Sequence, residues 1–163
     1  MKKIIMLVLF LLLPRLASAS DELMLNAVNK SLIEYESKNS QCIASSKMQS
    51  VSDDLIQKVK QVETDLSISI GYLYKNSLYQ CSLHELSTLM KLLLLVENSE
   101  KEEYPLTKLR VNEIKKLLFT KVDLRFELKF QSLPNEKQLT LTELGKSLAP
   151  FDLLDMYERA QAE

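Results

Sequence analysis

Residues 82–96 read Ser-Leu-His-Glu-Leu-Ser-Thr-Leu-Met-Lys-Leu-Leu-Leu-Leu-Val. Ser82 and Glu85 have the spacing of a capping box, in which each side chain bonds a backbone amide that the first helical turn leaves free. A helix is therefore predicted to begin at Leu83. Its apolar residues become continuous towards its end, which is typical of a helix covered on several sides. We expect this helix to be the spine of the core.

Helical periodicity continues on both sides of this stretch, because apolar residues recur every three or four positions. The segments with this pattern are 21–38, 53–66, 105–118 and 142–157, the last interrupted near Pro150. The Ser-rich, polar residues 39–52 are predicted to be a connection that ends in a helix cap at Ser50 or Ser52. Residues 67–75 alternate poor helix formers with apolar residues, so helix, turn and strand all stay open there.

The period changes at residues 121–131, which read Lys-Val-Asp-Leu-Arg-Phe-Glu-Leu-Lys-Phe-Gln. Apolar and polar residues alternate strictly here, as in a β-strand with one solvent-exposed face. Residues 133–137 supply a turn and 138–142 a second short strand, so a β-hairpin over about 121–142 is predicted. The expected fold is mainly α, a bundle of four to five helices with a small C-terminal β-hairpin; an α+β fold is the alternative.

The N-terminus has the three parts of a secretory signal peptide: Met1-Lys2-Lys3, an apolar run over 4–13, and Ala17-Ser18-Ala19. Cleavage after this last triplet would leave residues 20–163 as the mature chain. The apolar run is far shorter than the roughly 20 residues of a membrane-spanning helix. Position 20 is Ser, where a bacterial lipoprotein would need Cys. We therefore expect a periplasmic or secreted protein without a stable membrane anchor.

The charge and glycine content of the mature chain argue against two kinds of ligand. The signal peptide takes away three basic residues, which leaves 18 of the 21 basic residues against 22 acidic residues, a net charge of about −4. Because the basic residues are interleaved with acids, no basic stripe exists to bind nucleic acid. Gly71 and Gly145 are the only glycines, so a glycine-rich phosphate-binding loop is excluded. The length of 20–163 favours one domain.

Cys42 and Cys81 are the only cysteines, and an even count in an exported chain predicts a disulfide between them. An unbroken helix over 53–80 would hold them apart, because it would be about 40 Å long while their α-carbons must approach to about 7 Å. Either the chain turns back within residues 66–72, or the bond joins two molecules. We favour the turn, since Ser residues and Gly71 weaken helix propensity there.

Few residues offer catalytic or metal-binding chemistry. His84 is the only histidine, which excludes a two-histidine metal site, and it is expected to be an exposed residue of a first helical turn. Cys81 and His84 have the spacing of a thiolate with its base, yet an oxidising compartment favours the disulfide. The acidic residues within 97–103 lack the Asp, Asn and Gly of a calcium loop and are expected to be a solvated helix end. We therefore assign no catalytic, cofactor-binding or metal-binding residue.

We expect the mature protein to be a non-catalytic binding or accessory protein that acts through contacts with another protein. Examples are an inhibitor or immunity protein and an assembly factor for an envelope, pilus or secretion system. One alternative is a glycan-cleaving enzyme with two carboxylates about 5–9.5 Å apart. The other is a carrier whose residues 92–96 line a cavity for an apolar ligand. The oligomeric state stays open.

The edge of the predicted hairpin is the expected partner-binding surface. A two-stranded ribbon leaves unpaired backbone groups, to which a foreign strand can add. Arg125, Glu127 and Lys129 lie on the polar face of the first predicted strand and are the expected contact residues. The alternative is that these alternating charges only keep the edge soluble.

Overall fold

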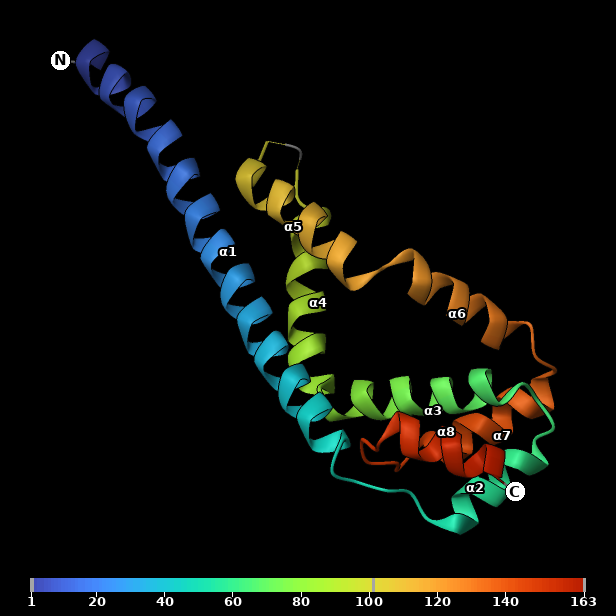
Figure 1. Cartoon of the computed structure of the whole chain (residues 1–163). Coiled ribbons are helices and arrows are strands. Elements are labelled where there is room, and N and C mark those ends of the chain that lie inside the picture. Colours follow the sequence, from blue (N-terminus) through green and yellow to red (C-terminus); the bar gives the residue numbers. More distant parts are fainter. Residues whose placement is uncertain (1, 101, 163) are drawn as a thin grey trace. The chain divides into compact units, whose positions relative to one another are not determined.

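The computed structural model describes the backbone of residues 2–100 and 102–162 and the side chains of 19–100 and 102–162. Eight helices and no strand occur among these residues (Figure 1). The helices are α1 (Lys2–Ser46), α2 (Asp53–Gln61), α3 (Leu66–Cys81), α4 (Leu83–Glu97), α5 (Pro105–Leu118), α6 (Lys121–Gln131), α7 (Asn135–Gly145) and α8 (Leu153–Ala162). Over the described side chains, none of these helices combines the length and hydropathy needed to cross a bilayer. The expected signal peptide at 1–19 lies outside the described side chains except for Ala19.

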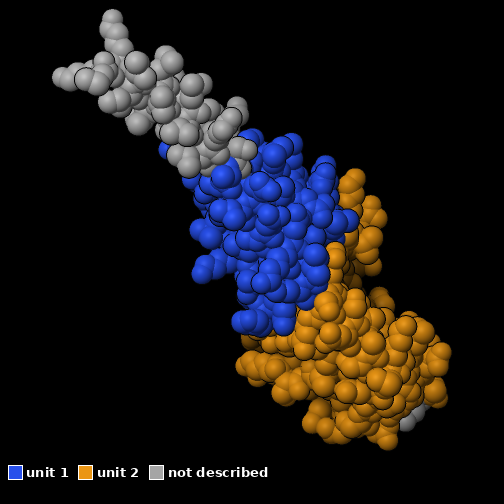
Figure 2. Space-filling model, turned by 90° about the vertical axis from the view of Figure 1, so that its left-hand side faces the viewer, with its two compact units in different colours: residues 1–35, 84–118 blue, residues 36–83, 119–163 orange. Residues whose placement is uncertain are grey.

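The chain divides into two compact units, each assembled from two segments of sequence (Figure 2). Unit 1 comprises Met1–Tyr35 and His84–Leu118, and unit 2 comprises Glu36–Leu83 and Phe119–Glu163. Each unit has its own cluster of buried apolar side chains. The mainly helical fold expected from the sequence is confirmed, but with more helices than the four to five predicted. The single domain expected from the chain length stays a prediction.

The core of unit 1 lies between α4, α5 and the part of α1 that precedes Tyr35. Its buried side chains are Val28, Leu32, Leu89, Leu93, Val96, Val111 and Ile114. α4 begins at Leu83, as predicted. Leu94 and Leu95 are nevertheless about half-exposed, because the leucine run winds around the helix while only one side of α4 faces the core. α4 therefore contributes to the core of unit 1 and is not the spine of the whole chain.

Asp21 of α1 caps the N-terminus of α5 within unit 1. Its carboxylate accepts hydrogen bonds from the amides of Leu106 (3.0 Å) and Thr107 (3.1 Å) and from the Thr107 hydroxyl (2.6 Å). The first turn of a helix leaves its amides without partners, so a carboxylate there is favourable. Burial raises the pKa of Asp21, but the bonds from Thr107 and Leu106 outweigh burial and hold the pKa below its usual range.

Replacing Asp21 by Asn should lower the free energy of unfolding by about 1–3 kcal/mol, because the side-chain nitrogen of Asn cannot accept hydrogen bonds. The loss should also depend on pH. With a lowered folded pKa, the carboxylate stabilises the fold above its unfolded pKa of about 3.9, and this contribution disappears as the pH falls through the folded pKa.

Thermal melting is the measurement for this prediction. The difference between wild type and Asp21→Asn should be large at about pH 7 and much smaller at about pH 2.5. Asp54→Asn is the control, because the Asp54 side chain is largely exposed. Equal effects of the two substitutions at neutral pH would contradict the capping role of Asp21.

α3 is the central helix of unit 2, and α2, α6, α7 and α8 all contact it (Figure 1). The unit's buried core residues are Val51, Ile56, Val59, Val62, Ile70, Leu73, Phe130, Leu141, Phe151, Met156 and Ala160. Both glycines lie where another helix approaches α3 closely. A Cβ on Gly71 would lie 2.8 Å from the ring of Phe126, and one on Gly145 would lie 2.6 Å from the Nδ2 atom of Asn76. Residues 67–75 are thus helical, and Gly71 makes room for a neighbour and does not form a turn.

The predicted β-hairpin over 121–142 is wrong, because these residues form α6 and most of α7. Thr120 caps α6 by accepting a hydrogen bond from the Asp123 amide at 3.1 Å. Leu, Arg, Glu and Lys in the segment are good helix formers, and Phe126 and Phe130 are one helical turn apart on the side that meets α3. Strict alternation therefore fitted a strand, whereas local capping and contact with α3 select a helix.

The disulfide joins Cys42 near the end of α1 to Cys81 at the end of α3, with α-carbons 6.1 Å apart, within one chain. α1 continues to Ser46, so residues 39–46 of the predicted connection at 39–52 are helical, and only residues 47–52 form a link. The chain turns back as expected, but over 62–65, before the predicted position. Glu63 adopts a left-handed φ of 54°, and Asp65 starts α3 by accepting a bond from the Ser67 amide at 2.8 Å.

Replacing Cys42 or Cys81 by Ser should lower the free energy of unfolding by about 2–5 kcal/mol, because either change reopens the loop between them. Chemical denaturation of the mature protein measures this loss. The double variant should be no less stable than the singles, since both singles already lack the bond. Non-reducing electrophoresis should show a monomer that migrates more slowly after reduction; a reducible dimer would contradict the intramolecular bond.

Candidate functional site: the outer face of helix α6

The inner side of α6 is held firmly against α3 in unit 2. The ring of Phe130 stacks on Tyr72 with centroids 3.9 Å apart, and Phe126 covers Gly71. The Lys75 ammonium group bonds the Asp123 carboxylate at 2.5 Å and lies 5.2 Å from the centroid of the Phe126 ring. These contacts fix the rotation of α6 about its own axis.

Asp123 connects the start of α6 to α3. Hydrogen bonds from Lys75 and from the Thr120 hydroxyl lower the pKa of Asp123, and they outweigh partial burial, which raises it. The Asp123 carboxyl group therefore loses its proton more readily than a free aspartate. Its role is to hold the helix in place, since Lys75 and Thr120, which bond it, both belong to unit 2.

The opposite side of α6 presents two leucines to solvent. Leu124 and Leu128 are one helical turn apart, and each is 60% exposed. They are exposed because an alternating sequence wound into a helix cannot place all of its apolar residues on one side. Single exposed leucines are ordinary, but two that are adjacent on one helix form a continuous apolar area and are a candidate contact surface. We call Leu124, Leu128 and the charged residues beside them the outer face of α6.

The structure does not bring the three predicted contact residues together. Arg125, Glu127 and Lys129 are all exposed, but a helix turns by about 100° per residue, which places Arg125 and Lys129 on one flank of the leucines and Glu127 on the other. Glu127 accepts a hydrogen bond from the Gln131 side chain at 2.8 Å. The addition of a foreign strand, which motivated the prediction, has no strand edge to use among the described residues.

Lys121, Arg125 and Lys129 form a ladder of like charges along one flank, at intervals of four residues, and we call it the basic ladder. Like charges at this spacing destabilise a helix by about 0.2–0.5 kcal/mol per pair. Within the described part of the chain, neither Lys121 nor Arg125 takes part in an ion pair. Hydrogen bonds from Ser67 are the main cause of the lowered pKa of Asp65, and the positive charge of Lys129 lowers it further. The ladder thus carries positive charge that the fold leaves largely uncompensated.

The structure also places the other residues that the sequence analysis considered for catalysis or metal binding. Cys81 is in the disulfide and offers no thiolate to His84, which is exposed. Glu97 pairs with Lys115, and the Lys108 ammonium group bonds the carbonyls of Ser99 and Glu100 at the tip between α4 and α5. No group of three His, Cys, Asp or Glu side chains in the described chain is arranged to hold a metal ion.

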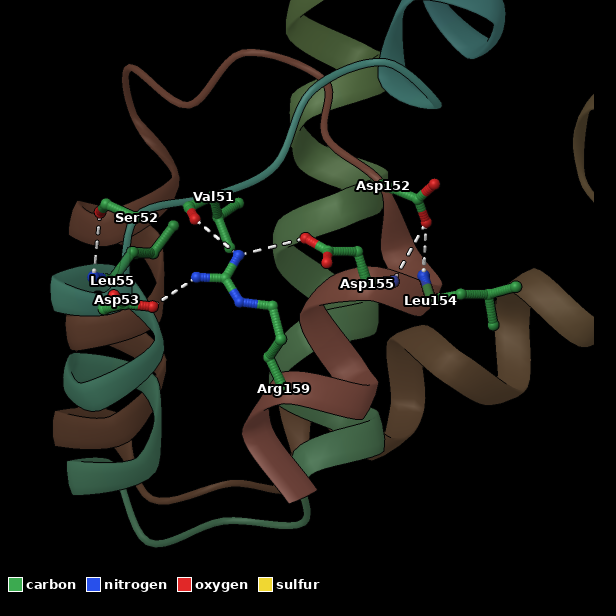
Figure 3. Close-up of polar contacts among 8 residues, drawn as sticks. All are labelled: Val51, Ser52, Asp53, Leu55, Asp152, Leu154, Asp155 and Arg159. Atoms are coloured by element: carbon green, nitrogen blue, oxygen red, sulfur yellow. Dashed lines mark hydrogen bonds and ion pairs between the residues drawn. The ribbon is translucent and has the colours of Figure 1, made fainter. Parts of the chain in front are cut away.

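A cluster around Arg159 is a polar network that sequence reasoning missed (Figure 3). Its guanidinium group bonds the carbonyl of Val51 at 2.9 Å, the Asp155 carboxylate at 3.1 Å and the Asp53 carboxylate. Asp53 and then Asp155 raise the pKa of Arg159. Glycan cleavage uses two carboxyl groups that face the substrate, whereas both carboxylates here are bonded to the guanidinium group of Arg159. The network fastens α8 to the start of α2.

Figure 3 also shows the caps at the starts of α2 and α8. Ser52 caps α2, as predicted, by accepting a bond from the Leu55 amide at 3.3 Å. Asp152 accepts a bond from the Leu154 amide at 2.9 Å at the start of α8, and its own amide donates to the carbonyl of Gln49 at 2.8 Å. The link 47–52 is therefore tied down along its length by the C-terminal helix.

Compared with known proteins, the chain matches no family model, no curated protein and no solved structure. Its function must therefore be inferred from its own surface and chemistry.

Replacing Phe130 by Ala should lower the free energy of unfolding by about 3–5 kcal/mol, because Phe130 is buried against Tyr72. Replacing Leu128 by Ala should change it by no more than about 0.5 kcal/mol, because that side chain is mostly exposed. Chemical denaturation measures both. In the predicted hairpin the two residues would share the buried face, so equal and large losses would contradict the helix.

Proposed function

We propose that the mature chain is an exported, non-catalytic binding protein that contacts a partner protein through the outer face of α6. An inhibitor or immunity protein, or an assembly factor of the cell envelope, is the kind of protein meant. The observation that carries the proposal is the exposed pair Leu124 and Leu128, flanked by the basic ladder on one side and by Glu127 on the other.

The outer face has the features of a helix that docks into a groove on another protein. Such helices present apolar anchors three or four residues apart, and charged residues beside the anchors set the orientation and raise the rate of association. The stacked Phe130 and the Lys75–Asp123 bond hold α6 before a partner arrives. A surface held in its binding conformation loses less entropy on association.

A second helix with exposed leucines fits the proposal less well. Leu106, Leu109 and Leu117 of α5 in unit 1 are also mostly exposed. Most of the cations near these leucines are already bonded within the fold: Arg110 bonds Glu113 at 2.9 Å and Asn29 at 2.9 Å, and Lys115 bonds Glu97. In the basic ladder of α6, neither Lys121 nor Arg125 takes part in an ion pair among the described residues, so a partner gains more by binding there.

Export is supported by the N-terminal sequence and by the disulfide. Residues 1–19 have the composition of a signal peptide. Both cysteines of the chain are joined in one bond, and such bonds persist in oxidising compartments such as the periplasm.

The test uses the exported protein with an affinity tag, recovered from the periplasmic fraction of cells that make it naturally. Chemical cross-linking should yield a defined partner in a fixed ratio for wild type, and the double variant Leu124→Ser with Leu128→Ser should lose it by at least about tenfold, a difference of about 1.4 kcal/mol. The matched control is Met48→Ser with Leu154→Ser, which removes two other exposed apolar side chains of unit 2.

All three proteins should have the same melting temperature, because the replaced side chains are exposed. Undiminished recovery of the partner with the α6 double variant would show that the outer face is not the contact. Equal losses with both double variants would point to non-specific apolar adhesion and would also refute the proposal.

A further inference from the structure

The exposed side of α7 is chemically complementary to the outer face of α6. Leu139 is 64% exposed, and Glu136 and Glu143 lie three residues before it and four residues after it. Leu141 and Gly145, on the other side of α7, are buried in unit 2. α7 therefore presents one apolar residue with acids beside it, where α6 presents two apolar residues with cations beside them.

We propose that the outer face of α6 is covered by α7 of a second copy of this chain, with Leu139 seated between Leu124 and Leu128. Within one copy the two faces do not cover each other, because all three leucines are exposed. The inference rests on the proposed function in that it uses the same surface, and it names the partner as another molecule of the same protein.

The spacings along the two helices match when the helices run antiparallel. At about 1.5 Å per residue, Glu136 and Glu143 are about 10.5 Å apart, and Lys121 and Lys129 are about 12 Å apart. Leu139 lies about 4.5 Å from Glu136, and the midpoint between the two leucines of α6 lies about 4.5 Å from Lys129. Seating Leu139 at that midpoint therefore places Glu136 at the Lys129 end of the basic ladder and Glu143 at the Lys121 end.

The positions around the helix axes match only in this direction. A helix turns by about 100° per residue, so the position of each side chain around the axis can be worked out. On α6 the basic ladder lies to one side of the leucines, in the direction of helical rotation. On α7 Glu136 and Glu143 lie to the same side of Leu139. Antiparallel helices bring such equivalent flanks together, so cations meet acids. A parallel arrangement would bring Glu136 and Glu143 towards Glu127. Pairing α6 with α6 in antiparallel would set one basic ladder against the other, and both alternatives are therefore repulsive.

Neither side needs to break a strong internal interaction to form this contact. Glu143 pairs only with Lys146, the residue that follows α7, at 2.5 Å, and both side chains are more than half exposed. Exposed pairs of this kind contribute about 0–1 kcal/mol and exchange partners easily. Because each helix has only eleven residues, the contact is small, and self-association should be weak, at roughly micromolar concentrations or above.

Sedimentation velocity of the mature protein over a range of concentrations tests the proposal. Wild type should show self-association that weakens as salt is added. Lys129→Glu and Glu136→Lys should each weaken it by at least about tenfold, because each sets like charges against each other. The charge-matched controls Lys47→Glu and Glu158→Lys, both at exposed positions of unit 2, should leave it within about twofold of wild type.

Mixing the two weakened variants in equal amounts is the decisive arm. In a mixed pair, the α6 helix with Lys129→Glu meets the α7 helix with Glu136→Lys. The other contact joins the unchanged Lys129 and Glu136. The mixture and the chain carrying both substitutions should regain association. Failure of both to recover, with all variants folded by thermal melting, would overturn the proposal.

Other occupants of the outer face give different results. A wild-type protein that stays monomeric, while the α6 leucine variant still loses a cross-linked partner from cells, would refute the second copy and leave the proposed function intact. A monomer that binds vesicles of anionic lipid through Leu124 and Leu128, and cross-links to no protein, would refute both.

Discussion

The close contact between α3 and α6 is the constraint on which the surface of unit 2 depends. Gly71 has no side chain, so the ring of Phe126 can lie directly on the backbone of α3. One turn further along α6, Phe130 stacks on Tyr72, whose hydroxyl group lies 3.1 Å from that of Thr142 on α7. This single set of aromatic contacts therefore connects three helices. It also decides which side of α6 faces solvent, and hence which leucines are available to a partner.

Several aspartates hold the N-terminal ends of helices in place. Asp21, Asp65 and Asp152 each accept hydrogen bonds from backbone amides at the N-terminus of a helix. Carboxylates at these positions satisfy amides that the first helical turn leaves free. Asp53 and Asp155 are likewise bound to Arg159. These five aspartates therefore have partners within the fold.

The charges of unit 2 are separated between neighbouring helices. α6 carries its cations along one flank, and α7 carries Glu136 and Glu143 beside Leu139. Fields of opposite sign on one molecule steer association and select orientation more than they add affinity. A contact built on a few leucines and a charge ladder is therefore specific in direction but weak, which suits reversible assembly.

Three features of this protein were predicted correctly from the sequence alone: the start of α4 at Leu83, the α2 cap as one of Ser50 and Ser52, and the pairing of Cys42 with Cys81. These depend on local chemistry or on there being only one possible pair. The tertiary structure decided the fold of residues 121–142, because strict alternation suits a strand and a two-sided helix equally. The contact with Gly71 and Tyr72 of α3, more than fifty residues earlier in the chain, joins the Thr120 cap in selecting the helix and turns Leu124 and Leu128 outward. Arg125, Glu127 and Lys129 were found because they are polar, but their division between two flanks follows from the 3.6-residue turn.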